Sequence, residues 1–302
     1  MKKNVFFFLM MLCSSVALSA EYEKKVYLWK DVPGMETNIR DTILYFFPAA
    51  RKTAEKAPCV IICPGGSYHH LGMKNEGFSS ARWFSSIGVS AFVLQYRVAY
   101  NCHHFPEQLE DVQMAIAHVR ENADGYGINA GKVGAIGFSA GGHLVTMAGE
   151  LSAENQLEKL GVSTKESLRP DFIMPIYPVV SMQDDIAHRW SRRSLLGHKA
   201  HTQERKDALS MENPANIPGD MPPVFLLACE DDPVVLYENS VRLARTLSQK
   251  GVDHVFVSYA EGGHGFGMMP NADIMRKHRW NDERLLPWLQ AHGVVDGASP
   301  AR

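Results

Sequence analysis

The sequence predicts a single α/β domain whose core is a mostly parallel, doubly wound sheet flanked by helices. Over most of the 302 residues, short apolar runs typical of strands alternate with amphipathic patterns typical of helices. One run, residues 59–63, is apolar at every position, as expected of a parallel strand buried on both faces. A hydrophobic content of 45% is sufficient for one large core.

The first half of the chain contains the strands that would start this sheet. Residues 25–29 and 42–47 flank a turn-rich stretch, and we expect them to pair as an antiparallel edge. After the strand at 59–63 we expect a helix around Phe78, Trp83, Phe84 and Ile87, a strand at 91–94, a helix with an apolar stripe at Leu109, Val112, Ile116 and Val119, and a strand at 133–138.

The second half continues the alternation. We expect a helix from residue 140, a strand at 172–177, an irregular, cap-like insertion at 180–222, a strand at 224–228, a helix at 237–249, a strand at 255–259 and a closing helix at 274–291. Ligands of doubly wound sheets bind at the carboxyl ends of the strands. Functional residues are therefore expected on the loops that leave the strands.

Residues 1–20 have the pattern of a secretory signal peptide, with Lys2 and Lys3 before an apolar run and small residues at 17–20. The single folded domain would then occupy residues 21–302, and the protein would be secreted or periplasmic. Lipid attachment at Cys13 is the alternative, which the large Leu12 before it disfavours. No later apolar run is long enough to span a bilayer.

Charge and cysteine content restrict the kinds of partner. The formal net charge is −2, and becomes −4 without Lys2 and Lys3, so we expect neither nucleic acid nor an anionic surface as a partner. Four cysteines remain after Cys13; Cys59, Cys63 and Cys229 lie in apolar strand-like runs and are expected to be buried free thiols, although their disulfide state and that of Cys102 stay open. No metal or cofactor is predicted, because no spacing typical of metal ligands occurs.

The motif Gly137-Phe138-Ser139-Ala140-Gly141 lies between a predicted strand and a predicted helix. A serine at the apex of such a G-x-S-x-G turn is exposed as a nucleophile. The pattern arises by chance in roughly one chain in ten of this length, so it needs partners elsewhere in the sequence.

Loops after other predicted strands supply those partners. The strand at 59–63 leads into a glycine-containing loop, and we assign the oxyanion donors to the backbone amides of Gly66, Ser67 and Ala140. Asp232 is the favoured acid because Pro233 bends the loop after it, while Asp231 stays an alternative. His264 lies in a glycine-flanked loop after the last strand, where a base must reach the nucleophile. The chain order Ser139, Asp232, His264 is that of the α/β-hydrolase fold.

The sequence resembles the α/β-hydrolase carbohydrate esterases related to acetylxylan esterases and bacterial feruloyl-esterase-like proteins, some of them mislabelled as endo-1,4-β-xylanases. The resemblance covers residues 56–292 and rests on residues 63–68, 96–97, 137–143, 194–197, 232–235, 238–240 and 262–267. It implies the same nucleophile, acid, base and oxyanion donors. Many relatives have a third glycine where this chain has Ser67.

By this resemblance we expect a serine esterase that removes acetyl or other small acyl groups from xylan-type carbohydrate through an acyl-enzyme. Tyr68, His69, His103 and Trp190 are candidates for contacting the sugar. His143 is interpreted as structural, and Arg97 and Asp111 either pair behind the site or are ordinary exposed charges.

The alternatives are a peptidase of the prolyl-oligopeptidase type, a general carboxylesterase or lipase, and an inactive sugar-binding surface protein. Residues 180–222 are too few for a large peptidase cap and too polar for a lipase lid. The sugar, the acyl position, acceptance of feruloyl groups and the oligomeric state stay open.

Overall fold

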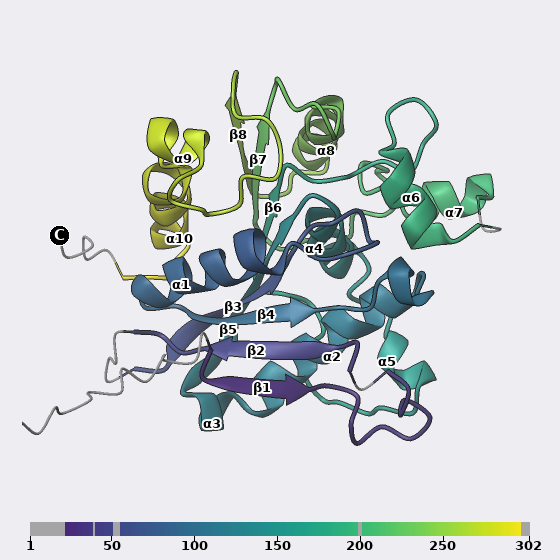
Figure 1. Ribbon diagram of the computed structural model, residues 1–302, viewed down its shortest axis with the longest axis vertical. Helices are drawn as coiled ribbons and strands as arrows, with labels where there is room; N and C mark the ends of the chain where they lie inside the picture. Colours follow the sequence, from purple (N-terminus) through teal and green to yellow (C-terminus); the bar gives the residue numbers. More distant parts are fainter. Residues whose placement is uncertain (1–21, 39, 51–54, 199–200, 297–302) are drawn as a thin grey trace, which may run out of the picture.

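The computed structural model describes residues 22–38, 40–50, 55–198 and 201–296. Its described strands form one eight-stranded sheet in the order β1-β2-β4-β3-β5-β6-β7-β8 (Figure 1). They are β1 (Lys24–Tyr27), β2 (Ile43–Phe47), β3 (Ala57–Cys63), β4 (Ser90–Gln95), β5 (Ile128–Phe138), β6 (Ile173–Ile176), β7 (Val224–Cys229) and β8 (His254–Tyr259). The expected signal peptide and Cys13 lie outside the described residues.

The sheet confirms the predicted mostly parallel α/β fold. Strand β2 pairs antiparallel with β1 and β4, and the remaining neighbours pair in parallel. The expected antiparallel edge is therefore present, and β3 and β5 lie at the centre of the sheet.

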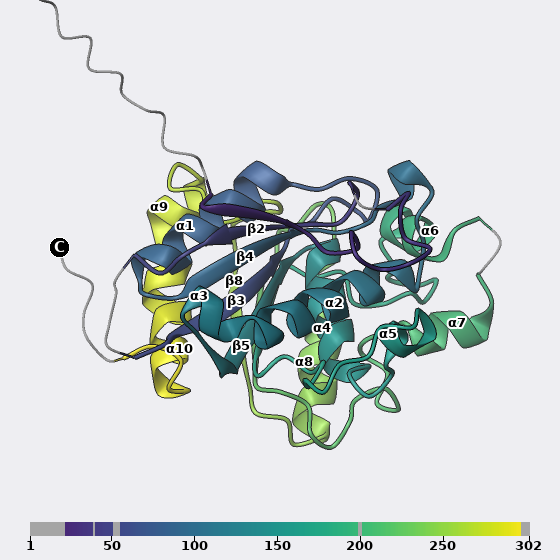
Figure 2. The ribbon, with the colours of Figure 1, turned by 90° about the horizontal axis from the view of Figure 1, so that it is seen from below.

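Helices cover both faces of the sheet (Figure 2). They are α1 (Ser79–Ser86), α2 (Glu107–Glu121), α3 (Ala123–Tyr126), α4 (Ala140–Glu150), α5 (Gln156–Lys159), α6 (Arg189–Leu196), α7 (Gln203–Ala208), α8 (Glu238–Gln249), α9 (Asp273–His278) and α10 (Leu286–Ala291). Side chains of α1, α9 and α10 pack on one face, and those of α2, α4 and α8 pack on the other. Short π-helical segments, η1 (Met73–Phe78) and η3 (Asn281–Leu285), and a 3₁₀ turn, η2 (Ala99–Asn101), complete the helical structure.

Strand β3 shows why its sequence is apolar throughout. Cys59, Ile61 and Cys63 belong to the core on one face, whereas Val60 and Ile62 belong to the core on the other. Successive side chains of a strand point to opposite faces, so a strand covered by helices on both sides needs apolar residues at every position.

The cysteines agree with the expectation of free thiols. Cys59, Cys63 and Cys229 are buried and free, and Cys102 is free and exposed. Burial raises the pKa of the Cys229 thiol to about 12, so this group stays protonated near neutral pH.

The prediction of one closing helix at 274–291 is wrong. The segment divides into α9, η3 and α10, with Arg279 in the left-handed conformation at a φ of 38°. Pro287 lacks an amide hydrogen and would clash inside a continuous helix, whereas the first turn of α10 accommodates it.

The expectation of an irregular insertion at 180–222 also needs correction, because the segment contains α6 and α7. His188 caps the first turn of α6, and the Thr202 hydroxyl accepts a hydrogen bond from the Arg205 amide at the start of α7. Both helices are short and rich in charged residues, so they lack the apolar periodicity by which helices are recognised in a sequence.

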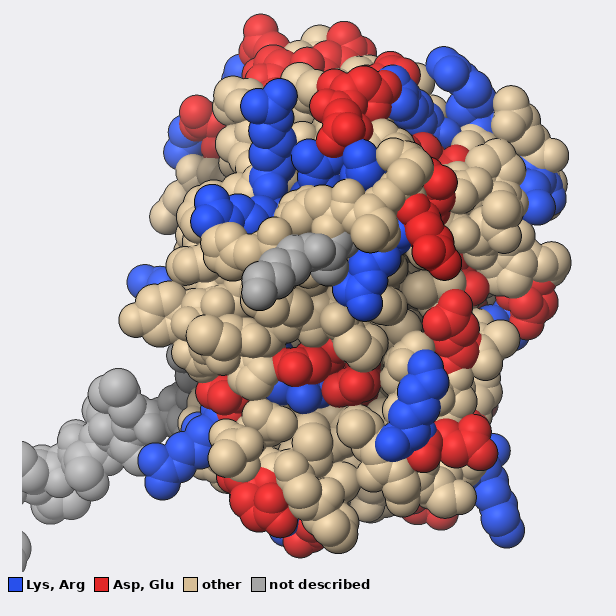
Figure 3. Space-filling model, turned by 90° about the vertical axis from the view of Figure 1, so that its right-hand side faces the viewer, with Lys and Arg blue, Asp and Glu red and all other residues tan. Residues whose placement is uncertain are grey.

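The surface carries charges of both signs. Figure 3 shows Lys and Arg side chains interspersed with Asp and Glu side chains on the face that includes α6 and α7. Within the described residues, no helix has the length and apolar character needed to cross a membrane.

Arg97 and Asp111 form a buried ion pair beside the central strands. The Asp111 carboxylate accepts hydrogen bonds from the Arg97 amide at 2.7 Å, from Arg97 Nε at 2.9 Å and from Trp29 Nε1 at 2.7 Å. Both side chains are buried, and Arg97 also contacts Glu110. The pair therefore ties the segment after β4 to α2, and of the two interpretations from sequence the buried pair is the one observed.

Replacing Asp111 with Ala should lower the free energy of unfolding by about 3–5 kcal/mol, because the Arg97 guanidinium would stay buried without its main partner. Urea denaturation measures this change. The control is Asp124→Ala, which breaks the exposed pair with Lys56 and should change the free energy of unfolding far less, because solvent screens that pair. Equal losses in the two variants would contradict the assigned role of the buried pair.

Candidate active site

Ser139 lies at a sharp turn between β5 and α4. Its φ of 54° and ψ of −117° are strained for a residue with a side chain. A Cβ atom on Gly137 would lie 1.9 Å from the carbonyl oxygen of Gly141, and one on Gly141 would lie 2.0 Å from the carbonyl oxygen of Cys63. Only glycine fits at these two positions, so the motif found in the sequence has a steric basis.

The structure brings Ser139, His264 and Asp232 into one chain of hydrogen bonds. His264 Nε2 lies 2.9 Å from Ser139 Oγ, and His264 Nδ1 lies 2.6 Å from Asp232 Oδ2. Because a carboxylate only accepts, Nδ1 carries the hydrogen and Nε2 is free to accept from the serine hydroxyl. The three residues follow β5, β7 and β8, at the carboxyl ends of the strands, where functional residues were expected.

The Asp232 carboxylate is fixed by its own loop. Its other oxygen, Oδ1, accepts hydrogen bonds from the amides of Val234 at 2.8 Å and Val235 at 2.9 Å. The side chain is only 3% exposed. The carboxylate is thus held with one oxygen directed at the imidazole.

Asp231, the alternative acid, contacts a different part of the site. Its Oδ1 accepts from the amides of Gly262 at 2.9 Å and Gly263 at 2.8 Å. These backbone hydrogen bonds lower the pKa of the Asp231 carboxyl. Asp232 therefore faces the imidazole, whereas Asp231 holds the loop that carries it.

The loop after β3 passes close to Ser139. A Cβ atom on Gly65 would lie 2.9 Å from Ser139 Cβ, and one on Gly66 would lie 2.1 Å from the carbonyl oxygen of His70. The amides of His69 and His70 donate to the Gly66 carbonyl at 2.9 and 3.0 Å, which closes a tight turn. Gly66 and Ser67 thus lie on one turn beside the serine, and Ala140 begins α4 on the other side.

Ser67 and Tyr68 both have a φ of 57°. Glycine adopts this left-handed conformation freely, whereas another residue there costs about 1 kcal/mol or more. Glycine would therefore fit this backbone with less strain than Ser67 does.

The prediction that Tyr68 contacts substrate is not consistent with its position. Its side chain is fully buried, and its hydroxyl donates to His143 Nδ1 at 2.8 Å. His143 Nε2 in turn donates to the Leu209 carbonyl at 2.8 Å. Tyr68 and His143 therefore connect the loop after β3 to α4 and to the segment after α7, and burial lowers the pKa of His143 to about 4.

His69 and Trp190 come together on the surface, as parts of what we call the aromatic platform: His69, His70, Tyr100 and Trp190. The ring of His69 lies 5.3 Å from that of Trp190 and 5.7 Å from that of Tyr100, and His70 lies 5.8 Å from Trp190. Trp190 is 48% exposed and Tyr100 is 74% exposed. A pocket of about 250 Å³ adjoins His69, His70 and Tyr100.

His103, the fourth residue predicted to contact substrate, is not part of the platform. Its ring is held by Glu107 and, at 3.3 Å, by Asp41. Tyr100, by contrast, was missed in the sequence, although it follows a predicted strand as the other site residues do.

Two residues beside His264 were also missed in the sequence. The ring of Tyr177 lies 4.7 Å from the imidazole of His264. His188 lies near His264 and Asp232. Burial lowers the pKa of His188, the charge of His264 lowers it further, and the charge of Asp232 raises it. Tyr177 directly follows β6, the neighbour of the serine strand, and that position was the available signal.

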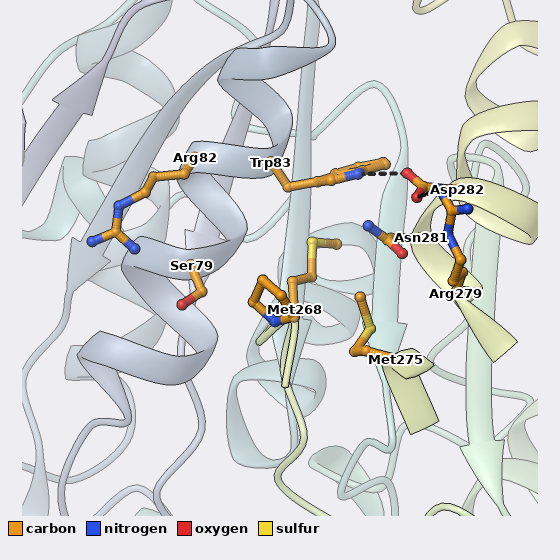
Figure 4. Close-up of a pocket in the computed structure, with 9 residues that line it drawn as sticks. Ser79, Arg82, Trp83, Met268, Met275, Arg279, Asn281 and Asp282 are labelled. Carbon is orange, nitrogen blue, oxygen red and sulfur yellow. Dashed lines mark hydrogen bonds and ion pairs between the residues drawn. The ribbon is translucent and has the colours of Figure 1, made fainter. Parts of the chain in front are cut away.

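A second pocket, of about 510 Å³, lies between α1 and the segment with α9 and η3 (Figure 4). Trp83, Met268 and Met275 supply apolar surface, and Trp83 Nε1 donates to Asp282 at 2.9 Å. Ser139, Asp232 and His264, the catalytic triad of the candidate site, do not line this pocket. Among the described residues, no group of three or more His, Cys, Asp or Glu side chains is arranged to hold a metal ion.

Comparison with known proteins identifies similar sequences. The family model described as BD-FAE matches residues 45–247. The chain is 28% identical over 209 residues to an acetylxylan esterase of Xylanibacter ruminicola, covering 69% of this chain and 41% of that protein. It is 32% identical over 218 residues to endo-1,4-beta-xylanase B of Butyrivibrio fibrisolvens, covering 70% of this chain and 32% of that protein. The chain thus spans less than half the length of these two curated relatives.

Solved structures resemble this chain over most of its length. An acetyl ester-xyloside bifunctional hydrolase of Caldicellulosiruptor lactoaceticus has a TM-score of 0.76 and 29% identity, covering 91% of this chain and 98% of that one. The esterase Est2 of Thermogutta terrifontis has a TM-score of 0.71 at 21% identity, covering 85% and 92%, and agrees in fold.

The buried His143 should make stability depend on pH. Its folded pKa of about 4 lies below the unfolded value of 6.5, so the unfolded chain binds the proton more strongly and stability falls as pH falls from 6.5 towards 4. Between pH 7 and pH 4, the wild type should lose about 3 kcal/mol more than the His143→Gln variant, which has no titrating group. Urea unfolding at several pH values measures the difference, and parallel pH profiles would disprove it.

Proposed function

Because the chain belongs to the BD-FAE family of α/β-hydrolase esterases, we propose that it is a serine esterase that releases acetyl or other small acyl groups from xylan-type carbohydrate. The observation that carries the proposal is the hydrogen-bonded chain of Ser139, His264 and Asp232 at the carboxyl end of the sheet. The carbohydrate part is supported by the names of the relatives and by the aromatic platform.

In the first half of the proposed reaction, Ser139 Oγ attacks the ester carbonyl while its proton passes to His264 Nε2. The Asp232 carboxylate stabilises the resulting imidazolium. The amides of Gly66, Ser67 and Ala140 are proposed to donate to the oxyanion. The imidazolium then protonates the sugar oxygen as the C–O bond breaks, which leaves an acyl group on the serine.

In the second half, water replaces the sugar. His264 Nε2 takes a proton from the water as its oxygen attacks the acyl carbonyl. The same amides donate to the second oxyanion, and the proton returns to Ser139 Oγ as the carboxylic acid leaves. No metal or cofactor takes part in this proposed sequence.

The aromatic platform supports a sugar as the alcohol part of the ester. His69 and His70 lie one turn beyond Gly66, so the platform adjoins the proposed oxyanion donors. Aromatic side chains offer an apolar face to the C–H groups of a sugar ring, and histidine adds polar atoms that can hydrogen-bond to its hydroxyls.

The rival functions find less support. Helices α6 and α7 are short and polar, unlike the apolar lid of a lipase or the large cap of a peptidase. An inactive sugar-binding protein has no need for a serine held in a strained turn beside a paired histidine. We also propose that the enzyme acts in the periplasm or outside the cell, because residues 1–20 have the pattern of a secretory signal.

Replacing Ser139 with Ala should abolish release of acetate from p-nitrophenyl acetate and from acetylated xylan, with kcat falling by about 10³-fold or more. The reason is that no other group can form the acyl-enzyme. Unchanged hydrolysis in the variant would reject Ser139 as the nucleophile. Cleavage of a dipeptide amide by the wild type in preference to both esters would favour the peptidase.

Replacing Trp190 with Ala should reduce kcat/KM for acetylated xylan about tenfold more than kcat/KM for p-nitrophenyl acetate, because only the polymer reaches the platform. Val255→Ala is the control, since Val255 is 40% exposed on β8 and should leave the ratio of the two substrates unchanged. Equal losses on both substrates in the Trp190 variant would contradict a role in binding the sugar.

A further inference from the structure

A buried chain of hydrogen bonds connects the loop of the proposed oxyanion donors to the loop of His264. The Gly65 amide donates to Glu76 Oε2 at 2.7 Å, and the Tyr177 hydroxyl donates to Glu76 Oε1 at 2.9 Å. The Gly267 amide donates to the Tyr177 oxygen at 2.9 Å. Glu76 is 6% exposed and Tyr177 is buried.

The two ends of this chain are next to the reacting groups. Gly65 directly precedes Gly66, and Gly267 is three residues beyond His264. We propose that Glu76 and Tyr177 are positioning residues that hold the oxyanion loop and the His264 loop in a fixed relation to Ser139. This inference rests on the proposed function of the site, since its catalytic effect requires that function.

The hydrogen-bond directions suit an ionised carboxylate. Gly65 and Tyr177 each present a donor, because the Tyr177 oxygen already accepts from Gly267 and its hydrogen is directed at Glu76. A carboxylate accepts at both oxygens, whereas a glutamine side chain has one accepting oxygen and an NH₂ group that only donates. Burial raises the pKa of the Glu76 carboxyl, and the hydrogen bonds from Tyr177 and Gly65 oppose that rise.

The surrounding backbone leaves the carboxylate little room to move. A Cβ atom would lie 2.9 Å from Glu76 Oε2 at Gly65 and 2.8 Å from it at Gly72. At Gly267, where φ is 52°, a Cβ atom would lie 2.5 Å from the Asn75 carbonyl oxygen. The His264 loop therefore packs directly on the backbone beside Glu76, so the hydrogen-bonded chain from Gly65 to Gly267 has little freedom to move.

Apolar contacts hold the other sides of the link. The Tyr177 ring lies 4.7 Å from the His264 ring and 4.5 Å from the Phe266 ring. Met268, the residue after Gly267, is buried, as is Met275, and both line the pocket of Figure 4 together with the partly buried Trp83. A change at Glu76 can thus be transmitted to the imidazole through Tyr177, although Glu76 makes no hydrogen bond to His264 in the described contacts.

The test compares Glu76→Gln, Tyr177→Phe and the double variant with the wild type on p-nitrophenyl acetate. A misplacement of the base and donors by a fraction of an ångström should lower kcat by about 10–100-fold in each single variant, with KM changed less than about threefold. Because both side chains act in one chain of hydrogen bonds, the fold loss of kcat in the double variant should be no greater than that of the more impaired single variant. Independent roles would instead give the product of the two losses.

Matched controls distinguish positioning from general destabilisation. Glu150→Gln makes the same change at another buried glutamate, at the far end of α4. Tyr45→Phe removes a partly buried hydroxyl, which donates to Gln95. Both controls should keep wild-type kcat even where thermal unfolding shows an equal loss of stability. Hydrogen exchange of the peptide covering residues 262–270 should become faster in Glu76→Gln and in Tyr177→Phe but not in the controls.

The outcomes separate the two proposals. Wild-type kcat and unchanged exchange in both single variants would overturn the positioning role while leaving the esterase proposal intact. If the wild type hydrolyses no ester, the proposed function fails, and faster exchange at 262–270 in Glu76→Gln still decides whether the link holds the loop. If Glu76→Gln does not fold, Tyr177→Phe alone decides, and a kcat equal to that of Tyr45→Phe would reject the role.

Discussion

The backbone conformation of Ser139 is the constraint on which the rest of the site depends. Its positive φ is possible because β3, β5 and α4 approach each other so closely that Gly137 and Gly141 have no space for a side chain. The same closeness brings the loop after β3 to within contact of the serine. A strained residue of this kind persists only when the surrounding packing determines its conformation, and the buried faces of the central strands provide that packing.

Loops from several strands meet at this turn, and each is held by polar side chains, of which Asp231 is exposed whereas Glu76 and Tyr177 are buried. Asp232 is fixed by the amides of its own loop and accepts from His264, while Asp231 holds the glycines that precede His264. Glu76 and Tyr177 connect the loop after β3 to the loop that carries His264. Because hydrogen bonds in a buried environment are costly to leave unmade, the loops gain a definite geometry despite their high glycine content.

The groups proposed to bind sugar are held differently from the triad. Trp190 lies on α6, a short polar helix, whereas the triad follows strands of the central sheet. Trp190 and Tyr100 remain substantially exposed, and their contacts with His69 and His70 lie at the surface. Differences in substrate among related proteins can therefore arise in this region without altering the strands that hold the serine.

The sequence by itself determined the alternation of strands and helices and indicated that functional residues lie at the carboxyl ends of the strands. It also identified Ser139, Asp232 and His264 as residues that follow strands. These features are local, because apolar periodicity and glycine spacing are written in neighbouring residues. The break at Arg279 was missed because the apolar pattern continues across it, although Pro287 is incompatible with one continuous helix. The helices of the insertion were missed because they begin at capping residues and have no apolar periodicity. Only the tertiary structure decided that Asp232 rather than Asp231 faces His264, that Tyr68 is buried, and that Tyr100 joins Trp190. It alone showed that Glu76 and Tyr177 connect two loops, because that relation depends on residues about 100 and 90 positions apart meeting in space.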